Sequence, residues 1–167
     1  IFSGKKNVKI EAYRKKLTVF FSDIKGFTEI TDRLEPEVLS TLLNSYLNEM
    51  SKIALKYGGT IDKFVGDAIL IFFGDPETKG DKEDAYSCVL MALEMQERMH
   101  HLKNLWEDQG ITNPLEIRIG INTGYCNVGN FGSKNRLDYT IIVGEFNLAS
   151  RLESNAMTGQ ILISQET

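Results

Sequence analysis

The chain has 167 residues, with 19 lysines and arginines against 23 aspartates and glutamates, so its formal net charge is −4 with both histidines neutral. Hydrophobic residues make up 42% of the chain and charged residues 25%, which is typical of a globular domain and excludes a disordered or collagen-like chain. A mildly acidic chain has no basic field to hold a nucleic-acid backbone, so we expect no nucleic-acid partner.

The cysteines and the apolar runs exclude further classes. Cys88 and Cys126 form no CxxC pair, which argues against a disulfide framework or a zinc site. The longest apolar runs, such as 69–73, are only long enough for a strand, and the first residues lack the apolar stretch of a signal peptide. We therefore expect a cytoplasmic domain from a larger parent protein, in which a membrane anchor remains open.

The N-terminal part divides at residue 17. Residues 1–16 are rich in lysine and arginine and are predicted to form a basic lead-in or linker, with membrane or nucleic-acid contact as the less favoured alternative. Residues 17–167 are predicted to form one domain. It opens with a buried strand at 17–21 (LTVFF), which leads into a tight loop at Asp23 and Gly26.

The middle of the chain has clear helix and hairpin signals. Leucines and other apolar residues at three- and four-residue spacing predict a long amphipathic helix that starts near Pro36 and stops before Gly58. Residues 60–65 and 68–73 are strand-like runs separated only by Gly66 and Asp67, a pair typical of a two-residue hairpin turn. The tip of that hairpin is therefore a carboxylate.

The C-terminal half alternates between helix and strand signals. The predicted elements are a second helix over 85–102, strands at 115–121, 125–128, 137–143 and 161–163, and a helix at 147–153. This order predicts a mixed α/β (α+β) sandwich, a βαββαβ core with helices packed on one face of a mainly antiparallel sheet.

Two carboxylates stand out by their place in these elements. Asp23 follows the first strand and Asp67 is at the hairpin tip, and in a βαββ unit the two can lie side by side. Two close carboxylates are costly unless a cation bridges them, and oxygen ligands favour Mg²⁺ or Mn²⁺. Taken alone, each aspartate is also a common turn residue, so both interpretations stay open at this point.

The loop after Asp23 suggests a guest for such a metal pair. Gly26 lets backbone N–H groups face an anion where the chain enters a helix, although loop glycines are also common in plain turns. A triphosphate beside a metal pair is the chemistry of phosphoryl or nucleotidyl transfer.

Four segments then resemble one family. They are FFSDIKGFTEI (20–30), IDKFVGDAILIFFG (61–74), RIGINTGYCNVGNFG (118–132) and YTIIVGEFNLASRLES (139–154). In this order and spacing they resemble the class III adenylate/guanylate cyclase catalytic domain of the bacterial adenylyl cyclase type. The resemblance implies a ferredoxin-like cyclase core and conversion of ATP to 3′,5′-cyclic AMP and pyrophosphate for intracellular signalling. It also implies a homodimer whose active sites are shared between subunits and use two divalent cations, Mg²⁺ or Mn²⁺.

The resemblance also implies roles for individual residues. One subunit would supply the metal ligands Asp23, Asp67 and the Ile24 carbonyl, and its loop Gly26, Phe27 and Thr28 would hold the phosphates. The partner would supply Lys63 and Thr140 for the base, Asn147 to orient the ribose and Arg151 to stabilise the α-phosphoryl group.

Base choice follows from hydrogen-bond polarity. Lys63 can only donate, which suits adenine N1, and the Thr140 hydroxyl can accept from the 6-amino group. Guanylyl members of the family typically carry an acidic residue at the lysine position, so Lys63 favours ATP.

Three features depart from the family pattern. The run 143–146 (VGEF) places its glycine one position late and ends in a bulky phenylalanine, Tyr125 stands where several relatives have a phosphate-binding arginine, and the expected final strand pair with its lysine lies beyond Thr167. Two alternatives therefore remain, a catalytically silent regulatory or dimerisation module and a guanylate cyclase. Relatives usually carry a linked sensor or membrane domain, and we expect one in the parent protein.

Overall fold

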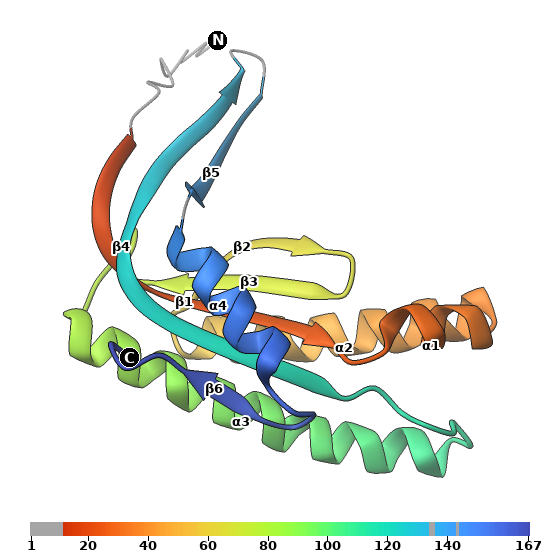
Figure 1. Cartoon of the computed structure of the whole chain (residues 1–167). Helices are drawn as coiled ribbons and strands as arrows, with labels where there is room; N and C mark the ends of the chain where they lie inside the picture. The colour runs from red at the N-terminus through yellow and green to blue at the C-terminus, as the bar shows by residue number, and fades with distance from the viewer. Residues whose placement is uncertain (1–11, 134–135, 143) are drawn as a thin grey trace, which may run out of the picture.

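A six-stranded sheet forms the centre of the molecule (Figure 1). The computed structural model describes residues 12–133, 136–142 and 144–167, and within these the side chains of 131–147 are outside the description. The elements in chain order are β1 (Ala12–Ile24), α1 (Phe27–Arg33), α2 (Pro36–Lys56), β2 (Thr60–Val65), β3 (Ala68–Phe73), α3 (Asp81–Asp108), β4 (Ile117–Ser133), β5 (Arg136–Ile142), α4 (Gly144–Asn155) and β6 (Ile161–Ile163). This α+β fold confirms the predicted fold class.

The strands run in the order β2-β3-β1-β4-β5, with β6 paired to β4. The pairs along this path are antiparallel, and only β6 runs parallel to its neighbour. The predicted hairpin of β2 and β3 is confirmed with its two-residue turn. Gly66 has φ 61°, a left-handed conformation that glycine adopts without steric cost.

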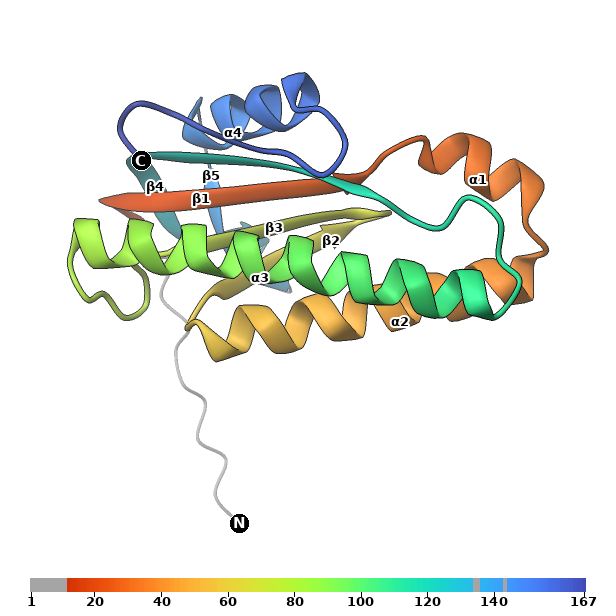
Figure 2. The same cartoon turned by 90° about the horizontal axis from the view of Figure 1, so that it is seen from below.

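Helices cover both faces of the sheet, whereas the sequence predicted them on one. Helices α2 and α3 pack on one face, where their apolar side chains meet those of the central strands (Figure 2). Helix α4 lies on the opposite face, where buried Ala149 packs with Val19 of β1 and Val128 of β4. Local pattern could not predict this arrangement, because the apolar stripe of a short helix such as α4 does not show which face of the sheet the helix covers.

The first strand is longer than its apolar run indicated. Residues 12–16, assigned from sequence to the basic lead-in, continue β1 and pair with β4, while residues 1–11 are outside the described part of the chain. Lys15 fits in this strand because its Nζ pairs with Asp75 Oδ1 at 3.1 Å, and the Tyr13 hydroxyl donates to the same carboxylate at 2.7 Å. Asp75 is sixty residues away in sequence, so local patterning could not reveal it.

The second long strand is also continuous. The sequence predicted separate runs at 115–121 and 125–128, but β4 passes through Gly124 without a break and curves as it crosses the sheet (Figure 1). Its alternation divides the two faces, since Ile117, Ile119 and Ile121 lie in the core under α2 and α3. The residues between them face α4.

Candidate active site

The end of β1 and the tip of the β2–β3 hairpin meet at one edge of the sheet. Because β3 pairs directly with β1, the turn that carries Asp67 lies beside Asp23 and Ile24. The Ile24 backbone N–H donates to Asp67 Oδ2 at 2.8 Å. This bond fixes the Asp67 carboxylate next to the end of β1, the juxtaposition that the sequence predicted.

The electrostatics of this corner favour a cation. Burial raises the pKa of Asp67 and the nearby negative charge of Asp23 adds to the increase, although the Ile24 N–H acts in the opposite direction. A divalent cation between the two carboxylates would remove this penalty. Two carboxylates and the Ile24 carbonyl leave further coordination positions for water and phosphate oxygens, as Mg²⁺ prefers, so these residues fit the predicted metal site.

Two further charged residues near Asp23, Arg118 and Glu153, were not predicted from the sequence. Arg118 of β4 is paired directly with Asp23 in the strand register. Its Nε and Nη2 donate to Asp23 Oδ1 and Oδ2 at 3.3 and 3.2 Å. The Arg118 Nε is also 3.1 Å from Glu153 Oε1 on α4, and its Nη1 donates to the Ser154 carbonyl at 3.4 Å.

Glu153 is unusual among these groups because it is only 1% exposed. No hydrogen bond to its Oε1 is formed within the described residues, so Arg118 offers charge without good hydrogen-bond geometry. Burial first, and then the adjacent Asp23 carboxylate, raise the pKa of Glu153 to about 8. The only signal in the sequence was the polar position of Arg118 within an alternating strand, which is ordinarily a surface position.

The loop expected to hold the phosphates follows directly on β1. Gly26 has φ 65°, and its carbonyl accepts the first helical hydrogen bond of α1, from Ile30 N at 3.1 Å. The Lys25 N–H donates to the Glu116 carbonyl at 2.9 Å, which ties the loop to the segment before β4. Phe27 is half-buried and Thr28 is exposed, at the start of α1.

The residues predicted to serve the partner's site lie elsewhere. Lys63 is exposed on the edge strand β2, and Arg151 is exposed on α4. Ala149 and Glu153, two residues to either side of Arg151, are buried, so Arg151 points away from its own sheet. Asn147 is one helical turn before Arg151, and Thr140 is on β5, but the side chains of both are outside the described residues.

One of the departures from the family pattern, Tyr125, can be located in the structure. Tyr125 is 55% exposed on β4, and the Arg14 guanidinium of β1 lies 5.2 Å from the centre of its ring. Val143 is outside the described residues and Phe146 is outside them for its side chain, so the consequence of the run 143–146 stays a prediction.

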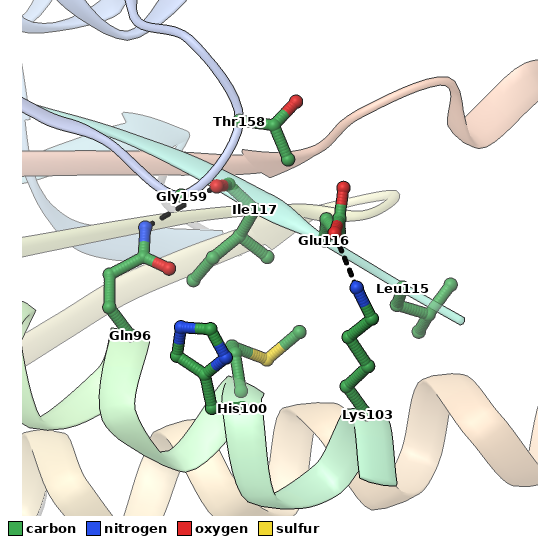
Figure 3. Close-up of a pocket in the computed structure, with 9 residues that line it drawn as sticks. Gln96, His100, Lys103, Leu115, Glu116, Ile117, Thr158 and Gly159 are labelled. Atoms are coloured by element: carbon green, nitrogen blue, oxygen red, sulfur yellow. Dashed lines mark hydrogen bonds and ion pairs between the residues drawn. The ribbon is translucent and has the colours of Figure 1, made fainter. Parts of the chain in front are cut away.

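A separate pocket of about 300 Å³ lies between α3, the start of β4 and the loop before β6 (Figure 3). Gln96 Nε2 donates to the Ile117 carbonyl at 3.3 Å, and Lys103 Nζ pairs with Glu116 Oε1 at 3.2 Å (Figure 3). These polar groups satisfy one another, and neither Asp23 nor Asp67 lines the pocket. The candidate active site is therefore the carboxylate corner.

The structure also describes the two cysteines and the helices. Cys88 and Cys126 are both buried, and neither is in a disulfide within the described part of the chain. Among the described residues, no helix is both long and apolar enough to span a membrane.

Comparison with known proteins identifies the family. The family described as "Adenylate and Guanylate cyclase catalytic domain" matches residues 8–167. Curated relatives include an adenylate cyclase of Anabaena cylindrica, 30% identical over 90% of this chain, and adenylate cyclase 1 of Rhizobium meliloti, 33% identical over 85% of it. The chain spans only 29% and 21% of the lengths of these two relatives.

Solved structures agree. The adenylyl cyclase CyaB from P. aeruginosa is 66% identical with a TM-score of 0.91, and the match covers 94% of this chain and 80% of that one. The guanylyl cyclase Cya2 is 40% identical with a TM-score of 0.86, over 92% and 76% of the two chains. The chain belongs to the adenylate and guanylate cyclase catalytic domain family, as its four sequence motifs predicted.

Proposed function

We propose that this domain is an adenylate cyclase, which converts ATP to 3′,5′-cyclic AMP and pyrophosphate at two sites shared between the subunits of a homodimer. The observation that carries the proposal is the corner where Ile24 N–H holds Asp67 beside Asp23. The similarity of the chain to an adenylyl cyclase of known structure, at 66% identity, supports ATP as the substrate.

The protein side chains would orient the reactants. Two divalent cations, Mg²⁺ or Mn²⁺, would supply activation of the ribose 3′-hydroxyl and charge neutralisation for the triphosphate when held by Asp23, Asp67 and the Ile24 carbonyl. Backbone N–H groups of the loop at 26–28 would bind phosphate oxygens. Arg151 would donate hydrogen bonds to the α-phosphoryl oxygens as negative charge builds up there, and Asn147 would hold the ribose in line for attack.

The geometry of one chain argues for a site made by two. Ala12 pairs with Gly129, and Gly129 pairs with Thr140, whereas Asp23 is 23 − 12 = 11 residues further along β1. At about 3.3 Å per residue this is roughly 36 Å measured along the strand, much longer than a nucleotide. Since Arg151 also points away from its own sheet, we infer that Thr140 and Arg151 serve the partner's metal site.

Lys63 supports ATP over GTP. Lys63 is exposed on the edge strand β2, so its side chain is available to a base at a dimer interface. The strand lies two strand spacings, about 10 Å, from β1, which carries Asp23. The Lys63 ammonium group can only donate, which matches adenine N1 and opposes the N1–H of guanine. A guanylate cyclase remains the second candidate because Thr140 can both donate and accept, and because the guanylyl cyclase Cya2 shares the fold at 40% identity.

The proposal is tested by measuring cyclic nucleotide formation from ATP and from GTP, with Mn²⁺ and Mg²⁺ in parallel, in the domain extended past Thr167. We expect cyclic AMP as the main product. Asp67→Ala is expected to reduce the rate by at least about 100-fold while leaving the fold and dimer intact, because it removes a metal ligand. The exposed Asp108→Ala change at the end of α3, far from the hairpin, is the control and should have little effect.

Each alternative predicts a different result in this assay. ATP binding without product in the extended domain would favour a silent regulatory module, and cyclic GMP as the main product would contradict the role of Lys63. We also propose a cytoplasmic location for the domain. We further propose a linked sensor domain, which is supported by the fact that this chain covers only a fraction of the length of its curated relatives.

A further inference from the structure

We propose that Arg118 of β4 is a positioning residue: it is anchored to helix α4 and holds the metal-binding carboxylate of Asp23 in place. This inference rests on the proposed function, because it assigns a role toward the metal ligands. Among the proposed ligands that the structure describes, Arg118 makes hydrogen bonds to Asp23, so it would position the metal through that side chain.

The arrangement of the guanidinium group carries the argument. Its Nε and Nη2 donate to the two oxygens of Asp23. Two parallel hydrogen bonds fix the orientation of the carboxylate plane, which a charge alone would not do. Each carboxylate oxygen keeps a second lone pair, so these bonds leave Asp23 able to bind a metal. The Arg118 side chain is 24% exposed, so the bonds are partly shielded from water.

The other side of the same group is anchored on α4. Nη1 donates to the Ser154 carbonyl near the C-terminal end of the helix, and Nε lies 3.1 Å from the buried carboxylate of Glu153. Burying Glu153 is costly, and within the described residues Arg118 is the cation in contact with it. Arg118 therefore cannot move toward solvent without leaving the buried carboxyl group of Glu153 without its cation.

The planar guanidinium group of arginine, with donors on three nitrogens, is essential to this role. A lysine has the same charge, but its three N–H donors are on one nitrogen, so it cannot reach both Asp23 oxygens and helix α4 with the planar, widely spaced donors of a guanidinium group. Hydrogen-bonding partners behind a metal ligand typically contribute 10- to 100-fold to metal affinity. We expect an effect of about that size when Arg118 is replaced.

The sign of the effect separates positioning from charge. Removing a positive charge beside a cation site strengthens cation binding if only Coulomb interactions matter. If Arg118 orients Asp23, its loss weakens binding instead. A merely electrostatic role and a positioning role thus predict opposite changes in metal affinity.

The experiment measures Mn²⁺ binding directly by electron paramagnetic resonance, without nucleotide, in the domain extended past Thr167. The variants are Arg118→Gln, Arg118→Lys and the control Arg98→Gln, an arginine on α3 whose partner is Glu49. We expect both Arg118 variants to bind Mn²⁺ about 10- to 100-fold more weakly, and Arg98→Gln to bind like the wild type. Circular dichroism melting checks that each variant is folded.

Two results would overturn the proposal. One is unchanged or tighter Mn²⁺ binding in Arg118→Gln, and the other is wild-type affinity in Arg118→Lys, which would make charge sufficient. If Arg118→Gln does not fold, the lysine variant decides alone. Asp67→Ala is measured alongside: if it also binds Mn²⁺ normally, the metal site itself is wrong, whereas weak binding in Asp67→Ala with normal binding in Arg118→Gln refutes only the positioning role.

Discussion

Three carboxylates, from Asp23, Asp67 and Glu153, lie near Arg118 at the end of β1. Arg118 pairs with Asp23 and Glu153, and its charge also partly offsets the raised pKa of Asp67 without a direct contact. The pKa values of Asp67 and Glu153 are both raised, chiefly by burial and further by the charge of Asp23. One arginine does not neutralise three acids, so this corner holds protons or attracts a cation. Its excess negative charge follows from tertiary contacts between β1, the hairpin and α4.

The protonation of Glu153 predicts a pH dependence of stability. Its pKa is about 8 in the folded chain against 4.5 for an ordinary glutamate, so between these values the native state binds more protons than the unfolded state. The free energy of unfolding therefore falls as pH rises through this window, by at most about 1.4 kcal/mol per pH unit from this group. The contribution is favourable at low pH and is lost as pH approaches 8.

Glu153→Gln tests this assignment, because glutamine keeps the shape of the side chain and does not titrate. Urea unfolding followed at several pH values between about 5 and 8, with a chelator present, should give a flatter pH profile for the variant than for the wild type. Parallel profiles for the two proteins would show that Glu153 does not titrate in this range.

At the scale of elements, the helices and turns that depend on local sequence pattern could be predicted from the sequence. The apolar spacing of α2 and the Gly66–Asp67 turn were sufficient to locate that helix and the hairpin. The full length of β1 could not be predicted, because its first residues are polar and their partner Asp75 is distant in sequence. Arg118 was missed for the same reason, since its partner Glu153 is on a helix that packs on the sheet from far along the chain.

Helix α4 depends on one glycine of β4. A methyl group at Gly120 would lie 2.1 Å from the Ala149 carbonyl oxygen and 2.4 Å from the Glu153 nitrogen, both backbone atoms. Only a residue without a side chain lets the helix approach the strand this closely. The position of α4, and with it the direction of Arg151, is therefore set at Gly120.

Gly120→Ala is expected to push α4 away from the sheet. Overpacking of this kind costs roughly 1–3 kcal/mol, and the displaced Arg151 should reduce cyclase activity more than the loss of stability explains. Gly58→Ala is the matched control, because a methyl group there meets nothing within 4 Å and the strain at φ 80° costs about 1 kcal/mol. Denaturant unfolding and cyclic AMP formation are measured for both, and equal activity in the two variants would contradict the role of Gly120.

At the scale of the whole molecule, the residues proposed to bind the metals and those proposed to bind the nucleotide lie far apart in a single chain. Asp23 lies at the end of β1 with Asp67 beside it, whereas Thr140 pairs with Gly129 of β4, which in turn pairs with Ala12 at the start of β1. Arg151 is exposed on α4. The same hairpin and the same helix α4 also carry exposed apolar side chains, including Val65 and Leu148. A two-fold dimer would bring each set of groups to the partner's complementary set and cover these side chains.

The most direct test mixes two inactive variants. Asp67→Ala removes a metal ligand and Arg151→Ala removes the phosphate-binding arginine, so each homodimer is expected to have no complete site. In a mixed dimer, the wild-type Asp67 of one subunit meets the wild-type Arg151 of the other, which restores one of two sites. With random mixing we expect about a quarter of the wild-type cyclic AMP production. No recovery, in a mixture shown to exchange subunits, would contradict a site built from two chains.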